Sequence, residues 1–536
     1  MAQTSVSRII VDRWAMPAVM LLAAVLLLFD LGGRALWWDE IINVLIDRQD
    51  VHGIMVSLSA APGAPASAQT DVHPPLFHLI QHFWIGLAGS SDFAVRLPSV
   101  VFALIALYLL YRIGCLIGGT TTGTLAALML AISPFWLLYA RMGRYYALTA
   151  MLGVASTLLY LELLKRPTRV KWISYLFINV LLLYTDYLVV TLLFCQFVYL
   201  LLARPDRRWL ATWFGTMALL GLAYLPWLPA WRAQGALMSS LAEADLSHSL
   251  VGTLLKFAFP LVSFAMGETA FPWELAAIVG YLLVAGLFVA GLIDFYRRPA
   301  PDKWVGPHLS FAVLFTVIPA LGTIAVITFV TPTIPFIGVS NRTFFAFPFV
   351  VLTIAAGLQS LERPALRAGI LILLTAVWGY AVRNYYAGEH FFNPIYAVPT
   401  ETALADILSQ AQPGDAIFSD TDTGFGYYFE QEPHANVTHY YLDTSAGDEA
   451  LAAIAIDVTT HQPPRHPRIF LLIYGRDRTR RDLPVPFTQT IEPAAHIVWE
   501  RGYTPQEVMY RQIKQSLLGR EDYQYKLLVR LYDLAQ

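Results

Sequence analysis

The apolar run WISYLFINVLLLYTDYLVVTLLFCQFVYLLLA occupies residues 172–203 and holds a single charged residue, Asp186. One helix of this length would be about 48 Å long at about 1.5 Å per residue, whereas a membrane span needs roughly 17–25 residues. The run is therefore long for one span and short for two. The choice between them fixes the side of the membrane on which every later loop falls.

The basic residues of the loops decide this choice, because cytoplasmic loops of membrane proteins are enriched in Lys and Arg. With a turn at Tyr184-Thr185-Asp186-Tyr187, nearly every basic cluster falls on one side of the membrane. A single span would place the clusters at 204–208 and 297–303 on the other side. The run therefore predicts two short or tilted helices, with the N-terminus of the chain in the cytoplasm and its C-terminus outside.

Composition independently indicates a polytopic membrane protein. Hydrophobic residues make up 57% of the 536 residues and charged residues only 14%, which excludes an ordinary soluble globule. The net charge of −2 gives no sign of nucleic-acid binding. Cys115 and Cys195 lie at the end of one apolar run and inside another, which indicates packing rather than a disulfide or a metal site.

The apolar runs predict a helical membrane module over residues 1–384 with about eleven transmembrane helices. The first run follows Arg8 and Arg13 and lacks a small-residue cleavage site, so we expect an uncleaved span rather than a signal peptide. Besides 172–203, which supplies two helices, the runs lie near residues 16–29, 97–111, 121–139, 145–164, 209–229, 273–295, 309–330, 343–360 and 368–382.

Two outer loops are expected to interrupt this module. The first, about 34–95, contains a linker of small residues at 60–70. The segment LFHLIQHFWIGLA at 76–88 follows it, with the spacing of a helix that lies in the membrane interface. The second loop, about 230–272, includes an apolar stretch at 249–271 that Lys256 and Pro260 interrupt. We expect this stretch to be interfacial or re-entrant.

From about residue 385 to residue 536 the composition changes to polar residues, Pro-Gly turns and short β-rich segments. Strands are predicted at 415–420, 437–442, 468–474 and 526–530, and helices at 400–411 and 446–456. This alternation predicts a small extracytoplasmic α/β domain. The domain contains no nucleotide-binding loop, no metal-spaced Cys/His set and no nucleophile elbow. The Asn436-Val437-Thr438 sequon is interpreted as a chance match.

Two adjacent carboxylates, Asp39 and Glu40, follow Trp37 and Trp38 just past the first apolar run. At a membrane–water boundary such a pair can act as a base or bind a cation. The alternative is an interfacial tryptophan belt with two solvated charges. The topology places further polar residues on the outer face, and several are arginines, against the charge bias. Each arginine alone is compatible with a snorkelling cap, but together they indicate an anion site beside a base. These residues are His73, Arg96, Arg141, Arg144, Asp186, Glu268 and Arg342.

Several stretches, taken in order, resemble bacterial GT-C glycosyltransferases of the group related to protein O-mannosyltransferases and lipid A aminoarabinose transferase. Each stretch is weak alone, but the ordered set is fairly specific, and it runs through the whole membrane module. One departure is Asp186, where relatives are expected to have histidine. The stretches are WWDE (37–40), HPPLFH (73–78), DFAVRLPSVVFALIALYLLYRIG (92–114), ARMGRYYALTAMLGVAS (140–156), LLYTDYLVV (182–190), LPWLPAW (225–231) and NRTFFAFPF (341–349).

This resemblance implies transfer of a sugar from a polyprenyl-phosphate donor to an acceptor on the extracytoplasmic side of the bacterial inner membrane. Asp39 is the candidate general base, and Glu40 supports it by orienting it or by binding a cation. Only one carboxylate cluster is evident, which favours direct, inverting displacement over a covalent intermediate. Candidate substrate-binding residues are Arg342 first, then Arg141 and Arg144, with Tyr145, His73, Arg96 and Asp186.

A divalent cation, Mg²⁺ or Mn²⁺, is left open as a cofactor, with Asp39, Glu40 and His73 as its candidate ligands. The first outer loop is expected to close over a bound donor, because its linker lacks bulky contacts. The alternative for the loop is a fixed wall packed on the C-terminal domain.

Two other functions stay open. A transporter or flippase for a lipid-linked or sugar substrate would need charges along its path, but the predicted spans between 97 and 382 carry almost none. A non-catalytic scaffold explains neither the acidic pair nor the outer arginines. The sequence leaves undetermined the sugar, the acceptor (lipid, protein or glycan), the oligomeric state and the role of the C-terminal domain.

Overall fold

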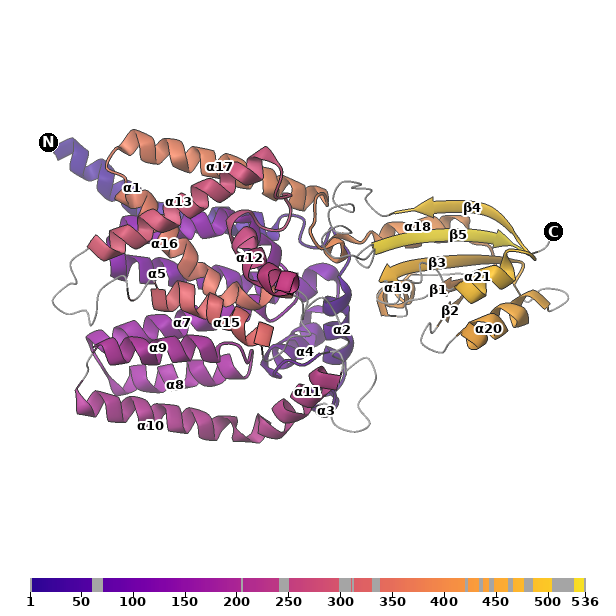
Figure 1. Ribbon diagram of the computed structural model, residues 1–536, viewed down its shortest axis with the longest axis horizontal. Coiled ribbons are helices and arrows are strands. Elements are labelled where there is room, and N and C mark those ends of the chain that lie inside the picture. The colour runs from indigo at the N-terminus through magenta and orange to yellow at the C-terminus, as the bar shows by residue number, and fades with distance from the viewer. Residues whose placement is uncertain are drawn as a thin grey trace. The chain divides into compact units, whose positions relative to one another are not determined.

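Figure 1 shows the computed structural model of the chain. The structure describes residues 2–59, 71–203, 206–240, 250–297, 310, 313–329, 338–419, 423–432, 437–442, 448–460, 466–476, 485–503 and 525–534. The predicted linker at 60–70, residues 241–249 of the second outer loop and Asn436 of the sequon lie outside these ranges.

The chain divides into two compact units. The first unit comprises Met1–Gly33 and Ile42–Phe392, and the second comprises Arg34–Ile41 and Asn393–Gln536. The sequence predicts a boundary at residues 384/385, whereas the structure places it at Phe392/Asn393. The structure also assigns the short segment Arg34–Ile41, which contains the acidic pair, to the C-terminal unit rather than to the membrane module.

The first unit is helical, as predicted, and the chain is a multi-pass membrane protein. Within the described ranges, six helices are long and apolar enough to cross a membrane, and five apolar helices are shorter. The number of spans, about eleven, stays a prediction. The helices are α1 (Ala2–Leu28), α2 (Trp38–Asp47), which begins in the second unit, α3 (Val51–Leu58), α4 (Leu76–Ala88), α5 (Asp92–Ile132), α6 (Pro134–Ala140), α7 (Tyr146–Lys165), α8 (Arg169–Leu183), α9 (Val190–Ala203), α10 (Arg207–Tyr224), η2 (Leu225–Trp227), α11 (Leu228–Ser240), α12 (Leu250–Met266), α13 (Leu275–Arg297), η4 (Val313–Val317), α15 (Ile318–Phe329), η6 (Asn341–Ala346), α16 (Phe347–Ser360) and α17 (Pro364–Ala387).

The run 172–203 forms two helices, α8 and α9, which confirms the predicted break. At the end of α8 the backbone N–H of Asp186 still donates to Leu182 O, at 3.1 Å. The Asp186 carboxylate then accepts from the backbone N–H of Leu188, at 2.9 Å. This side-chain bond closes the turn between the helices, which explains why the chain breaks at the charged residue.

The break predicted between the runs 97–111 and 121–139 lies inside α5, which Gly119 divides into two helical segments. Gly119 has φ 84° and ψ 176°, a conformation that favours glycine and ends a helix. A Cβ added to Gly114 would lie 2.5 Å from the Cα of Gly123. Such proximity is impossible nine residues apart in one straight helix, so the chain folds back at Gly119.

The predicted interfacial helix at 76–88 coincides with α4 (Leu76–Ala88). Its buried side chains are Phe77, His78 and Gln81, whereas Phe83 and Leu87 are exposed. One polar edge of α4 therefore faces the protein interior, and large apolar side chains remain for a membrane surface.

The second unit contains a five-stranded sheet with strand order β2-β1-β3-β5-β4. The strands are β1 (Ala416–Ser419), β2 (Thr438–Tyr441), β3 (Arg468–Arg476), β4 (His496–Gly502) and β5 (Tyr525–Asp533), and the helices are η7 (Pro394–Ala397), α18 (Thr400–Gln410), α19 (Thr423–Phe429), α20 (Asp448–Thr460) and α21 (Val485–Ile491). β1 pairs with β2 and β3 in parallel, and β5 pairs antiparallel with β3 and β4. The predicted α/β domain is therefore confirmed.

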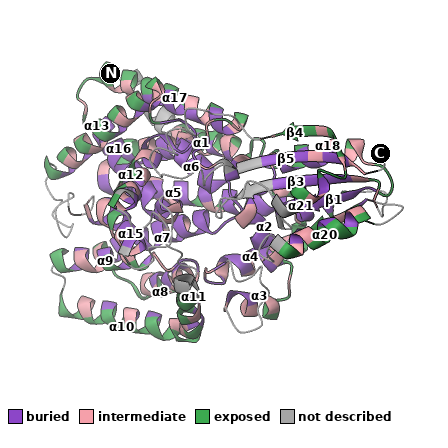
Figure 2. Cartoon of the chain, turned by 45° about the vertical axis from the view of Figure 1, so that its right-hand side comes forward, coloured by how far each residue is buried: buried purple, intermediate pink, exposed green. Residues whose placement is uncertain are grey.

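The sheet exposes its two edge strands and buries β1 between them. All four residues of β1 are buried, whereas three of the four residues of β2 and six of the seven residues of β4 are exposed (Figure 2). Phe418, Ile469, Leu471 and Tyr532 belong to one core cluster that also includes residues of α20 and α21. The sequence did not predict β4, because His496–Gly502 lacks a regular alternation of apolar and polar residues.

Candidate functional site

The acidic pair lies at the start of α2, where Glu40 has a structural partner. The Glu40 carboxylate accepts from the backbone N–H of Trp37, at 3.1 Å, so it satisfies a donor just before the helix. Glu40 is fully buried, while Asp39 is partly exposed in the first turn of α2. A carboxylate in the first turn is stabilised by the helix dipole. Asp39 is therefore the member of the pair that can meet a substrate.

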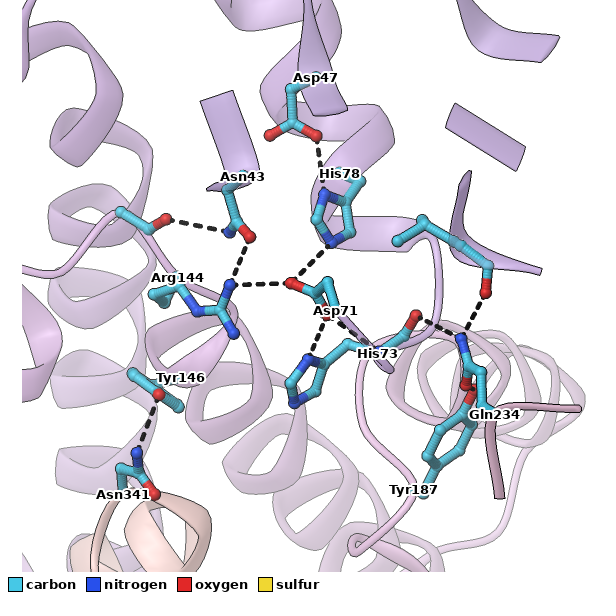
Figure 3. Close-up of polar contacts among 12 residues, drawn as sticks. Asn43, Asp47, Asp71, His73, His78, Arg144, Tyr146, Tyr187, Gln234 and Asn341 are labelled. Atoms are coloured by element: carbon cyan, nitrogen blue, oxygen red, sulfur yellow. Dashed lines mark hydrogen bonds and ion pairs between the residues drawn. The ribbon is translucent and has the colours of Figure 1, made fainter. Parts of the chain in front are cut away.

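A second group of polar residues, in the first unit, centres on Asp71 (Figure 3). One Asp71 oxygen lies 2.8 Å from Nη1 of Arg144 and 3.5 Å from Nε2 of His78. The other oxygen lies 2.5 Å from Nδ1 of His73 and accepts from the His73 backbone N–H, at 3.0 Å. Asp71 therefore joins two histidines of its own segment to Arg144, which is 73 residues further along the chain. We call Asp47, Asp71, His73, His78 and Arg144 the Asp71 cluster.

Helix α2 supplies further partners for the residues of the Asp71 cluster. Asp47 lies 2.7 Å from Nδ1 of His78, so His78 stands between two carboxylates. Asn43, one turn earlier in α2, accepts from Arg144 and donates to the backbone carbonyl of Gly143, at 3.4 Å. Arg144 is 4% exposed, and these contacts fix the direction of its guanidinium group.

Charges alternate along the Asp71 cluster. Burial opposes the charged form of His78, but the carboxylates of Asp47 and Asp71 outweigh it and raise the pKa of His78 to about 9. Burial raises the pKa of Asp47 to about 6. Burial acts in the same direction on Asp71, but His73, Arg144 and His78 outweigh it and hold its pKa well below the usual value. At neutral pH Asp47, His78, Asp71 and Arg144 are therefore all ionised.

His73 differs from the rest of the Asp71 cluster, because burial lowers its pKa. Asp71 opposes this shift, and the positive charges of Arg144 and Arg342 reinforce it. His73 is therefore neutral at pH 7, with Nδ1 donating to Asp71 and Nε2 left as an acceptor. Its ring packs on Tyr145, with 4.2 Å between the ring centroids.

Arg342 and Asp186 border the same group. Nη1 of Arg342 donates to Gly338 O, at 2.6 Å, at the start of η6, and its charge acts on His73, Tyr145 and Asp186. Burial raises the pKa of Asp186 to about 6, although the hydrogen bond from the Leu188 N–H and the charge of Arg342 both act to lower it. Five predicted substrate-binding residues therefore come together here: Arg342, Arg144, Tyr145, His73 and Asp186.

A family model described as dolichyl-phosphate-mannose-protein mannosyltransferase matches residues 72–231. No curated protein matches the chain. The fold is similar to that of ArnT from Cupriavidus metallidurans bound to undecaprenyl phosphate, with 13% identity and a TM-score of 0.54, over 96% of this chain and 97% of ArnT. The apo structure of the same ArnT has the same identity and TM-score, over 98% of each chain.

Residues 72–231, which include His73, Arg144 and Asp186, match that family model, and the fold of the chain is similar to that of ArnT. The comparisons support the predicted resemblance to GT-C glycosyltransferases, and the predicted fold class is confirmed.

Two of the predicted phosphate ligands bind backbone carbonyls just past the end of α1. Arg96 donates to Leu31 O, at 3.1 Å, and Arg141 to Phe29 O, at 2.6 Å. The Arg141 guanidinium also lies over the rings of Tyr385 and Tyr386, at 5.2 and 4.9 Å from their centroids. These contacts favour the capping alternative for Arg96 and Arg141.

Glu268, another residue expected on the outer face, is fully buried. It accepts from the hydroxyls of Tyr139, at 2.7 Å, and Ser340, at 2.6 Å. Burial raises the pKa of Glu268 to about 7, although these hydrogen bonds act to lower it. Glu268 therefore supports the segment that precedes Arg342.

Sequence reasoning missed Asn43, Asp47, Asp71, His78 and a further residue, Gln234. The Gln234 amide donates to Leu58 O, at 2.5 Å, and to His73 O, at 3.4 Å, while Tyr187 donates to Gln234 Oε1, at 2.5 Å (Figure 3). Asp71 and His78 had a local signal, because they lie two residues before and five residues after His73. The contacts of Asn43, Asp47 and Gln234 join segments at least 31 residues apart, as in the pair of His78 and Asp47.

A metal site stays a prediction. In the part of the chain that the structure describes, no three His, Cys, Asp or Glu side chains gather so as to hold an ion. Nδ1 of His73 contacts Asp71, and one Glu40 oxygen accepts from Trp37. Activity after dialysis against EDTA, with Mg²⁺ or Mn²⁺ added back, tests the prediction.

The ion pair of His78 with Asp47 makes the stability of the protein depend on pH. The pKa of His78 is raised from 6.5 to about 9, so the stabilisation is complete below about pH 6.5 and is lost as pH rises through about 9. At about 1.4 kcal/mol per pKa unit, the contribution is at most about 3 to 4 kcal/mol. We expect the thermal midpoint in detergent to fall between pH 7 and 10 in the wild type and much less in His78→Gln. The control is His82→Gln, because His82 contacts the backbone carbonyl of Asp47, at 2.8 Å, rather than its carboxylate. Equal pH dependence in wild type and His78→Gln would contradict this.

Proposed function

We propose that this protein transfers a sugar from a polyprenyl-phosphate donor to an acceptor hydroxyl or similar group on the extracytoplasmic side of the bacterial inner membrane. The observation that carries the proposal is the convergence of Arg144 and Arg342 on the neutral His73, in segments expected outside the membrane. The description of the matching family model and the undecaprenyl phosphate in the ArnT structure support the same class of donor.

The arginines suit the leaving group. When the bond between the sugar and the phosphate breaks, the lipid phosphate gains a negative charge, and fixed guanidinium groups stabilise that charge in the transition state. Arg144 is held in place by Asn43 and Asp71, so it needs no reorganisation. Arg342 is half-buried at the start of η6 and supplies the second charge.

The reaction on the acceptor side needs a base, because a neutral hydroxyl is a poor nucleophile. In the proposed step the acceptor oxygen attacks the anomeric carbon while the bond from that carbon to the phosphate oxygen breaks. The electron pair of that bond leaves with the phosphate, and the acceptor proton goes to the Asp39 carboxylate. A single displacement inverts the configuration. Glu40 supports Asp39 by holding the start of α2.

Transfer of radiolabel from a polyprenyl-phosphate sugar, by the full chain in detergent and in vesicles, tests this function. Label appearing in an acceptor supports it. Label that crosses the vesicle membrane without any change of chemical linkage would instead establish a transporter or flippase. Glycans and lipids from a deletion strain, compared with its parent, identify the sugar and the acceptor.

Arg342→Lys is expected to raise the KM for the donor about tenfold, equivalent to about 1.4 kcal/mol. Lysine keeps the positive charge but loses the planar fork that binds two phosphate oxygens. Arg383→Lys is the matched control, since Arg383 forms a solvent-exposed ion pair with Glu389. An unchanged donor KM in Arg342→Ala would mean that Arg342 only caps η6.

A further inference from the structure

We propose that the C-terminal unit positions the general base: the Tyr428 hydroxyl and the Tyr396 ring hold the residues that start α2, and so fix the direction of Asp39. The inference rests on the proposed function of Asp39. It gives the C-terminal unit a role in the reaction, with Tyr428 and Tyr396 as positioning residues.

Three contacts fasten two consecutive residues ahead of α2. The backbone N–H of Leu36 donates to the Tyr428 hydroxyl, at 2.5 Å, and that of Trp37 donates to Glu40, at 3.1 Å. The Trp37 ring meets the Tyr396 ring edge-to-face, with 4.9 Å between centroids and 87° between planes. Leu36 and Trp37 are both buried. The backbone and the side chain are thus both fixed immediately before the helix begins.

The first turn of α2 depends on these contacts because its own sequence caps it poorly. The residue before the helix is Trp37, which lacks the side-chain oxygen that Ser, Thr, Asp or Asn would offer to the first backbone N–H groups. Glu40 reaches back to one donor, and Tyr428 accepts from the donor before it. Asp39 lies inside this turn, so fraying there would move its carboxylate directly.

The helix that carries Tyr428 is itself well anchored. Tyr428 belongs to α19, where Phe425 and Phe429 pack on His439 of β2, with centroids 5.3 and 5.4 Å apart. His439 in turn lies 2.7 Å from the Ser419 hydroxyl at the end of β1. A continuous series of contacts therefore runs from the parallel strands to the backbone of Leu36.

Such a positioning role predicts a specific kinetic change. An active-site group displaced by about 1 Å can lose up to about 100-fold in rate, while substrate binding elsewhere is kept. Tyr428→Phe keeps the ring and removes only the hydroxyl, so we expect kcat to fall about tenfold with an unchanged donor KM. Tyr396→Leu removes the second contact and is expected to act in the same direction.

The experiment measures kcat, donor KM and hydrogen exchange of the peptide covering residues 34–42 in the full chain. The control is Tyr503→Phe, which removes a tyrosine hydroxyl of the same unit that donates to Asp406, at 2.6 Å. Faster exchange in this peptide and a lower kcat in Tyr428→Phe, with neither in the control, support the proposal. Unchanged exchange in both Tyr428→Phe and Tyr396→Leu overturns it, as does an equal loss of kcat in the control.

The test separates this inference from the proposed function. If the wild type transfers no sugar, the proposed function fails, whereas hydrogen exchange still shows whether Tyr428 holds the segment. If the wild type is active and Tyr428→Phe has normal kcat despite faster exchange, the positioning role is overturned while the proposed function stands.

Discussion

Asp39→Asn is expected to lower kcat about 10²- to 10⁴-fold, the range that a general base contributes. Asparagine keeps the shape of the side chain and its place in the first turn of α2, but it cannot take the proton from the hydroxyl of the acceptor substrate. Folding and donor binding should therefore persist. The measurement is sugar transfer by the purified full chain, together with binding of a polyprenyl phosphate.

Two variants of nearby acidic residues sharpen the Asp39 experiment. Asp50→Asn is the matched control, because Asp50 caps α3 by accepting from Gly53, at 2.7 Å, and asparagine can do the same. Glu40→Gln keeps an oxygen for the Trp37 N–H and removes only the charge. A small effect of Glu40→Gln indicates an orienting role, and a large effect indicates cation binding. Near-normal turnover of Asp39→Asn would remove Asp39 as the base.

Asp71→Asn is expected to cost about 3–5 kcal/mol of stability, the usual result when one partner of a buried ion pair is removed. The variant leaves the positive charges of Arg144 and His78 buried without their shared carboxylate, 2.8 and 3.5 Å away in the wild type. Arg144 also loses a contact that fixes its direction, so the donor KM should rise. Thermal midpoints in detergent and donor kinetics measure the two effects.

The exposed pair between Arg383 and Glu389 provides the control for Asp71→Asn, since its atoms lie 2.9 Å apart but in solvent. Glu389→Gln should cost less than about 1 kcal/mol, as exposed pairs do. The double variant Asp71→Asn/His78→Gln removes one of the stranded charges and should recover part of the loss. A cost for Asp71→Asn no larger than that of Glu389→Gln would show that the Asp71 cluster is not a source of stability.

The helical architecture could be predicted because its signals are local. Apolar runs and the distribution of basic residues identify the break in 172–203, which the structure places at the turn closed by Asp186. The interfacial helix at 76–88 could likewise be predicted from the spacing of its own apolar and polar residues. The assignment of Arg34–Ile41 to the C-terminal unit could not be predicted, because its partners lie more than 350 residues away, with Leu36 and Tyr428 392 residues apart.

The candidate site was predicted only in part, because a residue type does not reveal its partner. Arg96, Arg141, Arg144 and Arg342 were expected to share one role. The structure separates them: two bind carbonyls after α1, Arg144 belongs to the Asp71 cluster, and Arg342 borders it. Asp47 was overlooked because a lone acidic residue at a helix end has the pattern of an ordinary solvated charge. Only the tertiary structure brings it against His78.

The order of strands in the C-terminal unit has a consequence for biosynthesis. β5, the last strand in sequence, lies between β3 and β4, so it is an internal strand of the sheet. β4 therefore has no hydrogen-bonding neighbour in the sheet until residues 525–533 have been synthesised. Until then β3 and β4 present open edges, which are the sites where unfinished sheets aggregate. The unit must therefore complete its sheet after most of the chain has left the ribosome, and a premature stop between β4 and β5 leaves both of these strand edges unpaired.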